Sequence, residues 1–184
     1  MKGFNMFKKI FVACTVATLL AAPSAWAGAP PPARDNMSHS LAVTGMVETS
    51  LTLTVADLRK LPPAHGGALA VTRHNGDKAE SITSYKGVRL RDILDQAVLD
   101  APGHNDVKKI AIIATATDGY AVVFSWGELY NAPAGEGVIV YYEKNGKALD
   151  ENDGAIGLIS AKDIRTGPRH VKWLNAIEVR KLVE

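Results

Sequence analysis

The feature that most limits the fold is the shortness of the apolar runs, which end every few residues at turn-forming dipeptides. Asp118-Gly119 and Asn145-Gly146 favour tight hairpin turns, and Asn75-Gly76 marks a third turn. Between residues 41 and 53, apolar side chains recur at even spacings with threonines between them, which is the period of a β-strand. The same reading predicts further strands at 68–73, 109–117, 120–125, 138–143, 155–160 and 176–182.

Helical signals are few and short. Residues 90–99 place four apolar side chains on one face of a helix. Thr54 followed by Asp57 resembles a helix cap, and Pro62-Pro63 ends that short helix, while 126–130 is long enough for one helical turn. We therefore predict an α+β fold, a single compact domain of mostly short β-strands with two or three short helices.

The first 27 residues have the pattern of a secretory signal peptide. Three lysines precede an apolar run at 10–22, and Ala25-Trp26-Ala27 forms an A-x-A cleavage site. We predict cleavage after Ala27 and a periplasmic mature protein that does not insert into the membrane. The proline-rich residues 28–38 then form a flexible leader, and 39–184 form the domain.

Charge and cysteine content exclude several classes of function. Without Lys2, Lys8 and Lys9, 18 basic residues remain against 19 acidic ones, so the mature chain has no broad excess of positive charge for nucleic acid. The only cysteine, Cys14, is removed with the signal peptide. The mature protein therefore lacks a disulfide, a thiolate nucleophile and a cysteine metal ligand.

Common catalytic and metal-binding motifs do not occur. The chain has no G-x-S-x-G, H-E-x-x-H, Walker or dinucleotide-binding pattern. Its histidines are scattered, without the i, i+4 spacing that brings two imidazoles to one zinc ion: His39, His65, His74, His104 and His170. We predict neither a metal site nor a set of catalytic residues.

Four segments, in order, resemble the sulfite-oxidase-type molybdopterin-binding domain. They read YKGVRLRDIL, ATATDGYAVVFSWGEL, VYYEKNGKALDENDGAIGLIS and GPRHVKWLNAIEV, at 85–94, 114–129, 140–160 and 167–179. The last is the most specific, because in that family a segment of the form R-x-V-K-W-L contacts the pterin and its phosphate before a closing strand. The resemblance covers the chain from about Val43 onward and implies the fold of that family.

The sequence departs from the family pattern at two points. Catalytic members carry a cysteine that ligates the metal, whereas the corresponding segment here, VTRHNGDK at 71–78, has Arg73 and His74 near that position. Thiolate is the soft ligand that holds the metal. Where catalytic members often have His-Gly, this chain has Asp153-Gly154, which removes positive charge from the phosphate end.

The resemblance then implies a non-enzymatic pterin-binding protein. A chain exported unfolded carries no cofactor, so its ligand would be an exchangeable pterin, free or molybdopterin-like, with no tightly held molybdenum. Some non-catalytic relatives regulate membrane enzymes that turn over cyclic di-GMP, and we expect the periplasmic domain of such a signalling protein as partner. The alternatives are a molybdopterin-dependent oxidoreductase with an atypical metal ligand, and an adaptor that lost the pocket.

The residues expected to bind the pterin are cationic, aromatic or acidic. Asp118 could bind the N–H edge of the ring bidentately, or simply form its hairpin turn. Trp126 could stack on the ring, whereas Trp173 is predicted to be a core residue. Lys172 is predicted to be a donor on a solvated loop, and its removal should change folding little. The complete predicted set is Arg169, His170, Lys172, Trp126, Asp118, Arg73, His74 and Arg165.

Overall fold

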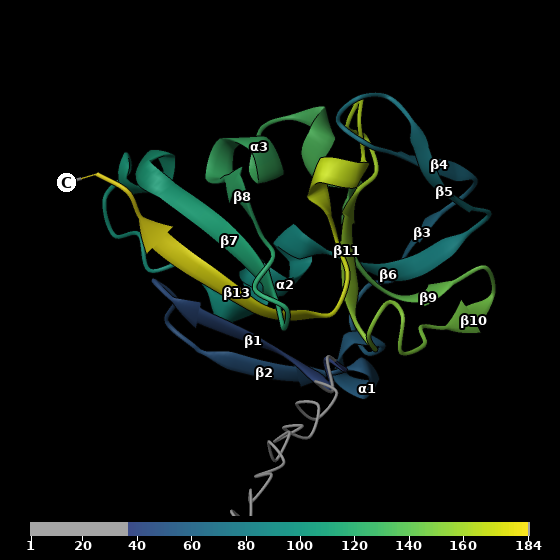
Figure 1. Ribbon diagram of the computed structural model, residues 1–184. Coiled ribbons are helices and arrows are strands. Elements are labelled where there is room, and N and C mark those ends of the chain that lie inside the picture. The colour runs from purple at the N-terminus through teal and green to yellow at the C-terminus, as the bar shows by residue number, and fades with distance from the viewer. Residues whose placement is uncertain (1–36, 184) are drawn as a thin grey trace, which may run out of the picture. The chain divides into compact units, whose positions relative to one another are not determined.

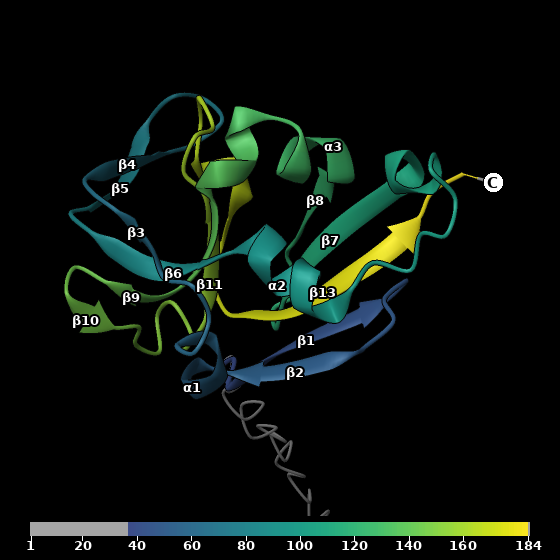
Figure 2. The same cartoon turned by 180° about the vertical axis from the view of Figure 1, so that it is seen from behind.

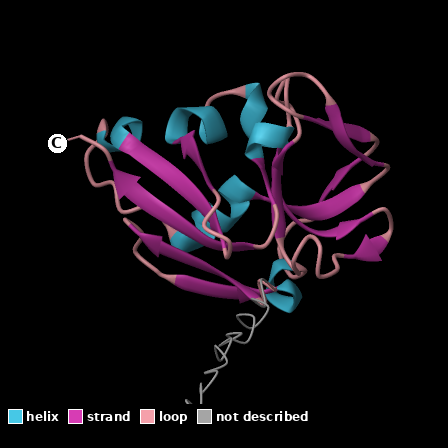
Figure 3. Ribbon diagram, in the orientation of Figure 1, coloured by secondary structure: helices cyan, strands magenta, loops and turns pink. Residues whose placement is uncertain are grey.

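The computed structural model describes residues 37–183, which contain two larger β-sheets, one two-stranded hairpin and three short α-helices (Figure 1). The predicted signal peptide and most of the predicted leader lie outside the described residues. Strands predominate over helices (Figure 3). The α+β prediction is confirmed.

The first sheet has five strands and is built around the last strand of the chain. Its order is β2 (Leu51–Thr54), β1 (Ser40–Gly45), β13 (Leu174–Lys181), β7 (Ile110–Ala116) and β8 (Ala121–Ser125). Strands β1 and β13 pair in parallel, and the other neighbours are antiparallel. The β7–β8 hairpin turns at Asp118-Gly119, as predicted, with Gly119 in the left-handed region at φ 91°.

The second sheet has β9 at its centre. Its order is β12 (His170–Val171), β11 (Gly157–Ser160), β9 (Val138–Lys144), β6 (Tyr85–Arg89) and β3 (Ala64–Gly66), and β10 (Lys147–Ala148) also pairs with β9. All five residues at 138–142 are buried, so both faces of β9 are covered. Val138, Val140 and Tyr142 belong to the main core.

The other face of β9 is covered by the hairpin of β4 (Leu69–Thr72) and β5 (Lys78–Ile82). Ile139 and Tyr141 pack there with Val71 and Ile82, in a second hydrophobic cluster that includes Leu149 and Ile159. The hairpin is a separate two-stranded sheet, so this apolar cluster attaches it to the second sheet.

The helices fill or close the main core. Helix α2 (Leu90–Ala97) buries Leu90, Ile93, Leu94 and Ala97, and lies between the first sheet and β6 in both views (Figures 1 and 2). Helix α1 (Val55–Leu58) has the predicted cap, because Thr54 Oγ1 accepts from Asp57 N and Asp57 Oδ2 accepts from Thr54 N. Helix α3 (Trp126–Tyr130) follows β8, also as predicted.

The short 3₁₀-helices lie in the connections between these elements. They are η1 (Asp106–Lys109), η2 (Pro133–Gly137) and η3 (Gly167–Arg169). No helix within residues 37–183 combines the length and the apolar character that a membrane crossing requires.

Several boundaries differ from the sequence-based prediction. The alternating run at 41–53 is two antiparallel strands, because the chain turns after Gly45. The helix at 90–99 ends at Ala97, and Val98 has a positive φ of 57°. The sequence did not predict β3, β5, β6, β10 or β12. The first three mix polar and apolar residues without a clear alternation, and the last two have only two residues each.

The prediction that Trp173 is a core residue is wrong. Trp173 is half-buried, has a left-handed φ of 51° and immediately precedes β13. Its backbone N–H donates to Asp153 O at 2.7 Å, and its indole N–H donates to Glu151 O at 2.7 Å. A side chain at Gly154 would collide with Trp173, since an added Cβ would lie 2.7 Å from its Cα. Trp173 therefore fixes the 151–154 loop against β13 instead of filling the core.

Candidate functional site

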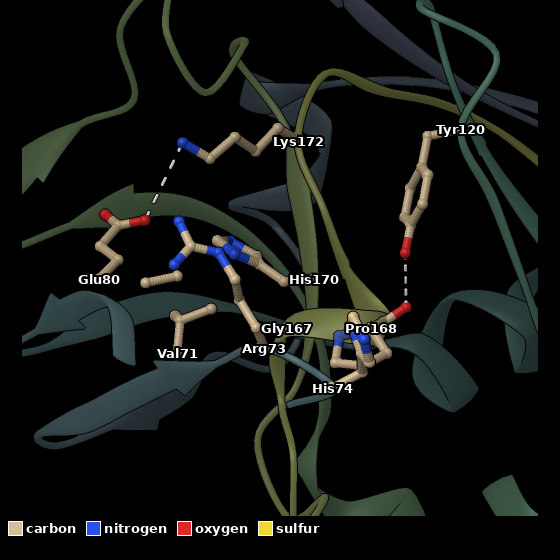
Figure 4. Close-up of a pocket in the computed structure, with 10 residues that line it drawn as sticks. Val71, Arg73, His74, Glu80, Tyr120, Gly167, Pro168, His170 and Lys172 are labelled. Atoms are coloured by element: carbon tan, nitrogen blue, oxygen red, sulfur yellow. Dashed lines mark hydrogen bonds and ion pairs between the residues drawn. The ribbon is translucent and has the colours of Figure 1, made fainter. Parts of the chain in front are cut away.

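A cavity of about 490 Å³ lies between the β4–β5 hairpin and the segment of η3 and β12 (Figure 4). The hairpin supplies one wall, which includes Val71, Arg73, His74 and Glu80. The opposite wall contains Pro168, His170 and Lys172, and Tyr120 of the β7–β8 turn closes one side. Its volume is in the range of small-molecule sites.

A buried threonine ties the two walls together. Thr166 Oγ1 accepts from the Thr72 backbone N–H at 3.1 Å and donates to Ala70 O at 3.1 Å. Arg165 donates to the His74 carbonyl oxygen from the same segment. Gly167 lies so close that an added Cβ would be 2.5 Å from Thr72 O, which leaves no room for a side chain. The hairpin is thus held at the distance that forms the cavity.

Arg73 presents a guanidinium group to the cavity. It lies in the turn of the hairpin, where its backbone N–H donates to Asp77 O at 2.8 Å. Figure 4 shows its side chain directed toward Glu80 and His170. Within residues 37–183, no ion pair or hydrogen bond engages its guanidinium, so its donors are available to a ligand.

His170 is a neutral imidazole held by a buried tyrosine. Its Nε2 lies 2.7 Å from the hydroxyl of Tyr141, which is fully buried. Burial lowers the pKa of His170 to about 4, and burial raises the pKa of Tyr141 well above 10. His170 is the one hydrogen-bonding partner of this buried hydroxyl among residues 37–183, so we assign the phenol as donor to Nε2 and leave Nδ1–H as the ring's own donor.

Four charged side chains form a cluster at one end of the cavity. Lys144 contacts Glu80 Oε1 at 2.6 Å and also pairs with Asp153. Lys172 Nζ lies 2.8 Å from Asp153 Oδ1 and 3.9 Å from Glu80 Oε2. Burial of Asp153 opposes its ionisation, but hydrogen bonds from the two lysines outweigh it and lower its pKa. The cluster therefore carries two positive and two negative charges.

Lys172 differs from the solvated donor that the sequence predicted. Its side chain is 34% exposed, and its partner Asp153 is 4% exposed. Removing Lys172 would leave a buried carboxylate with one lysine instead of two, so its substitution also affects stability.

The structure gathers some of the predicted pterin-binding residues on the cavity and places others elsewhere. Arg73, His74, His170 and Lys172 line the cavity, and Arg165 supports it through the His74 carbonyl. Their role in pterin binding stays a prediction.

Arg169 faces away from the cavity wall. Its guanidinium contacts Asp163 at 2.5 and 2.7 Å and Glu128 at 2.5 Å, and lies 4.6 Å from the ring centre of Phe124. The pKa of Arg169 is raised, first by its hydrogen bonds to Asp163 and then by the one to Glu128. Arg169 thus joins η3 to α3.

Trp126 and Asp118 also lie outside the cavity wall. The ring of Trp126 stacks on Tyr130, with centres 5.4 Å apart, and packs against the main core. Asp118 accepts from the Tyr120 backbone N–H at 2.8 Å within the hairpin turn. Both side chains therefore have structural contacts of their own.

The sequence analysis missed Glu80 and Tyr120. Glu80 lies in a polar strand without a local signal, and only the hairpin fold brings it beside Lys144 and Lys172. Tyr120 follows the predicted turn, and its hydroxyl donates to Pro168 O at 2.7 Å. That bond, which joins residues 48 positions apart, could not be seen in the sequence.

The described part of the chain offers no evident metal centre. Across residues 37–183, no three His, Cys, Asp or Glu side chains are grouped so that they could hold a metal ion.

Residues 27–183 match the family described as oxidoreductase molybdopterin binding domain. The chain belongs to this family. A search of curated proteins found no match. A solved structure with a similar fold is the sulfane dehydrogenase SoxCD from Paracoccus pantotrophus, with a TM-score of 0.56 and 18% identity over 80% of this chain. The match spans 39% of that longer chain and confirms the predicted sulfite-oxidase-like fold.

The cofactor that this family implies fits the cavity only in part. Arg73, His170 and Lys172 could donate to a pterin ring, and the volume suits one. A thiolate metal ligand is absent, because Cys14 is the only cysteine and precedes the family match. The positive charge of Lys144 and Lys172 is offset by Glu80 and Asp153, which leaves little for a phosphate.

Replacing Thr166 by valine should loosen the hairpin that forms one cavity wall. The change keeps the shape but removes both hydrogen bonds, so the free energy of unfolding should fall by about 1 to 3 kcal/mol. Urea denaturation measures this, with Thr166→Ser as the control that keeps the hydroxyl. Equal stability of the valine variant and wild type would show that the hydroxyl does not hold the hairpin.

The lowered pKa of His170 should make stability depend on pH. The unfolded chain binds a proton at this histidine below about pH 6.5, whereas the folded protein does so only near pH 4, so stability falls as the pH drops through this window. Wild type should lose about 2 to 3 kcal/mol more than His170→Gln, which keeps an acceptor for Tyr141 but does not titrate. Denaturation at several pH values gives both curves, and parallel curves would refute the burial of a neutral imidazole.

Proposed function

We propose that this protein binds an exchangeable pterin in the cavity between the β4–β5 hairpin and β12, and acts as a non-enzymatic sensor. The observation that carries the proposal is a cavity that offers donors for a ring but has no cysteine on either wall, in a chain that belongs to a molybdopterin-binding family. Such a site can recognise the organic part of the family's cofactor without the thiolate that anchors a metal.

The cavity walls provide what a flat heterocycle needs. A pterin has a carbonyl and ring nitrogens that accept hydrogen bonds, and Arg73, His170 and Lys172 carry N–H donors at the cavity. The imidazole of His170 and the guanidinium of Arg73 also have flat faces on which a ring can stack. Val71 adds apolar surface.

The proposed cellular role is in the periplasm. The lysines, apolar run and A-x-A site within residues 1–27 support export, and an exported chain would acquire its ligand outside the cytoplasm. We propose that the periplasmic domain of a membrane signalling protein, of the kind that controls cyclic di-GMP turnover, responds to the pterin-bound state.

An oxidoreductase is the second candidate, and two observations favour it. The family is described as oxidoreductase. His74, one of the two residues near which the resemblance places the cysteine of catalytic members, lies on the cavity wall. Imidazole is a common metal ligand, although it is less soft than thiolate. The enzyme would contain molybdenum in a one-to-one ratio, whereas the sensor would not.

Arg73→Ala should weaken pterin binding without unfolding the protein. Loss of a charged donor costs about 1 to 3 kcal/mol, which is roughly 5- to 150-fold in affinity. Stability should change by less than about 0.5 kcal/mol, because the side chain is exposed and no partner within 37–183 engages it. Titration followed by pterin fluorescence measures the affinity.

Lys147→Ala is the matched control for Arg73→Ala. Lys147 is also an exposed cation, in β10, but it does not line the cavity. The Lys147→Ala variant should bind pterin with the wild-type affinity. If Arg73→Ala binds pterin as tightly as Lys147→Ala, the ligand is not held at this wall.

A further inference from the structure

The acidic residue on the cavity wall is Glu80, and its surroundings fix its orientation. Lys144 holds Oε1 at 2.6 Å, and the side chain is 28% exposed. Each carboxylate oxygen can accept more than one hydrogen bond, so both oxygens retain capacity toward the cavity. Lys144 therefore orients the two carboxylate oxygens of Glu80 and leaves both able to accept further hydrogen bonds.

Lys172 provides a donor immediately beside this acceptor pair. Its Nζ lies 3.9 Å from Glu80 Oε2 and is anchored at 2.8 Å by the buried Asp153. Glu80 and Lys172 lie side by side at one end of the cavity, and Tyr120, Pro168 and His74 lie at the other (Figure 4). This end of the cavity thus presents one hydrogen-bond donor, the Lys172 ammonium, followed by two acceptors, the carboxylate oxygens of Glu80.

We infer that Glu80 and Lys172 read the edge of a 2-amino-4-oxopyrimidine ring. That edge carries a carbonyl oxygen, a ring N–H and an exocyclic amino group, which is the order acceptor, donor, donor. The Lys172 ammonium donates to the carbonyl, and the Glu80 carboxylate accepts from the two N–H groups as a bidentate pair. The inference rests on the proposed pterin-binding function and names the group that selects the ring.

The same arrangement sets the direction of the ligand. With this edge against Glu80 and Lys172, the ring lies along Val71 and His170, and a substituent on its far side points toward Tyr120 and Pro168. Asp118, which the sequence suggested for the N–H edge, accepts from Tyr120 N in its own turn, away from the cavity wall.

The decisive comparison is between 6-hydroxymethylpterin and 6-hydroxymethyllumazine, in which a carbonyl replaces the 2-amino group. Wild type should bind the pterin roughly 10- to 100-fold more tightly, because the lumazine places an acceptor against the carboxylate. In Glu80→Gln, which has one donor and one acceptor, this ratio should fall to about 1 to 3. The ratio is measured within each variant, so a partly unfolded fraction affects both ligands equally.

Glu128→Gln is the matched control, because Glu128 also pairs with a cation, Arg169, but lies outside the cavity wall. It should keep the wild-type ratio. The assignment of Glu80 to the ring edge would be overturned if Glu80→Gln kept the wild-type ratio of pterin to lumazine affinity. It would also be overturned if wild type bound pterin and lumazine equally well, and in both cases pterin binding itself would stand.

Two further outcomes separate this inference from the proposed function. If wild type binds neither ligand, the pterin-binding function itself fails. Guanosine has the same edge on a different ring system, so tighter binding of guanosine than of the pterin, with loss in Glu80→Gln, would keep the edge assignment and overturn the pterin.

Discussion

The burial of β9 on both faces is the constraint on which the rest of the structure depends. A strand with five consecutive buried residues, at 138–142, needs apolar partners on two sides. The main core provides one side, and the β4–β5 hairpin provides the other through Val71 and Ile82. Without the hairpin, Ile139 and Tyr141 would be exposed to water.

The cavity is a consequence of this packing. The hairpin that covers β9 also reaches η3 and β12, where Thr166 and Arg165 bind its backbone. Lys144, at the end of β9, pairs with Glu80 of the hairpin, and Tyr141 of the same strand holds His170. The central strand thus orients both an acid and an imidazole at the cavity.

Local patterns predicted the strands and turns but not which side chains share a site. The Thr54 cap and the Asp118-Gly119 turn depend on neighbours within three residues, and both were predicted correctly. Strand β12 begins only at His170, so alternate side chains face opposite ways from there on, and His170 and Lys172 both reach the cavity. Arg169 ends the preceding 3₁₀-helix and pairs with Asp163 and Glu128 instead. The sequence shows a cluster of cations in the segment at 169–172, but it does not show at which residue the strand begins. It therefore does not show which of these side chains face the same way.

Glu80, Asp153 and Trp173 show the limit of sequence reasoning most clearly. Glu80 and Asp153 meet Lys144 and Lys172 through contacts between distant segments. Trp173 begins an apolar run, yet the chain bends there into a left-handed conformation. Each outcome depends on tertiary packing, which no local period encodes.

The central claim, a proposal, is that the cavity between the β4–β5 hairpin and β12 holds a pterin without a thiolate-bound metal. The most direct test is to express the full sequence, isolate the protein and determine the small molecules and metals bound to it, by mass spectrometry and elemental analysis of the same sample. The account predicts a pterin released on denaturation, with molybdenum far below one atom per chain. Molybdenum in a one-to-one ratio with the protein would contradict it and favour the oxidoreductase.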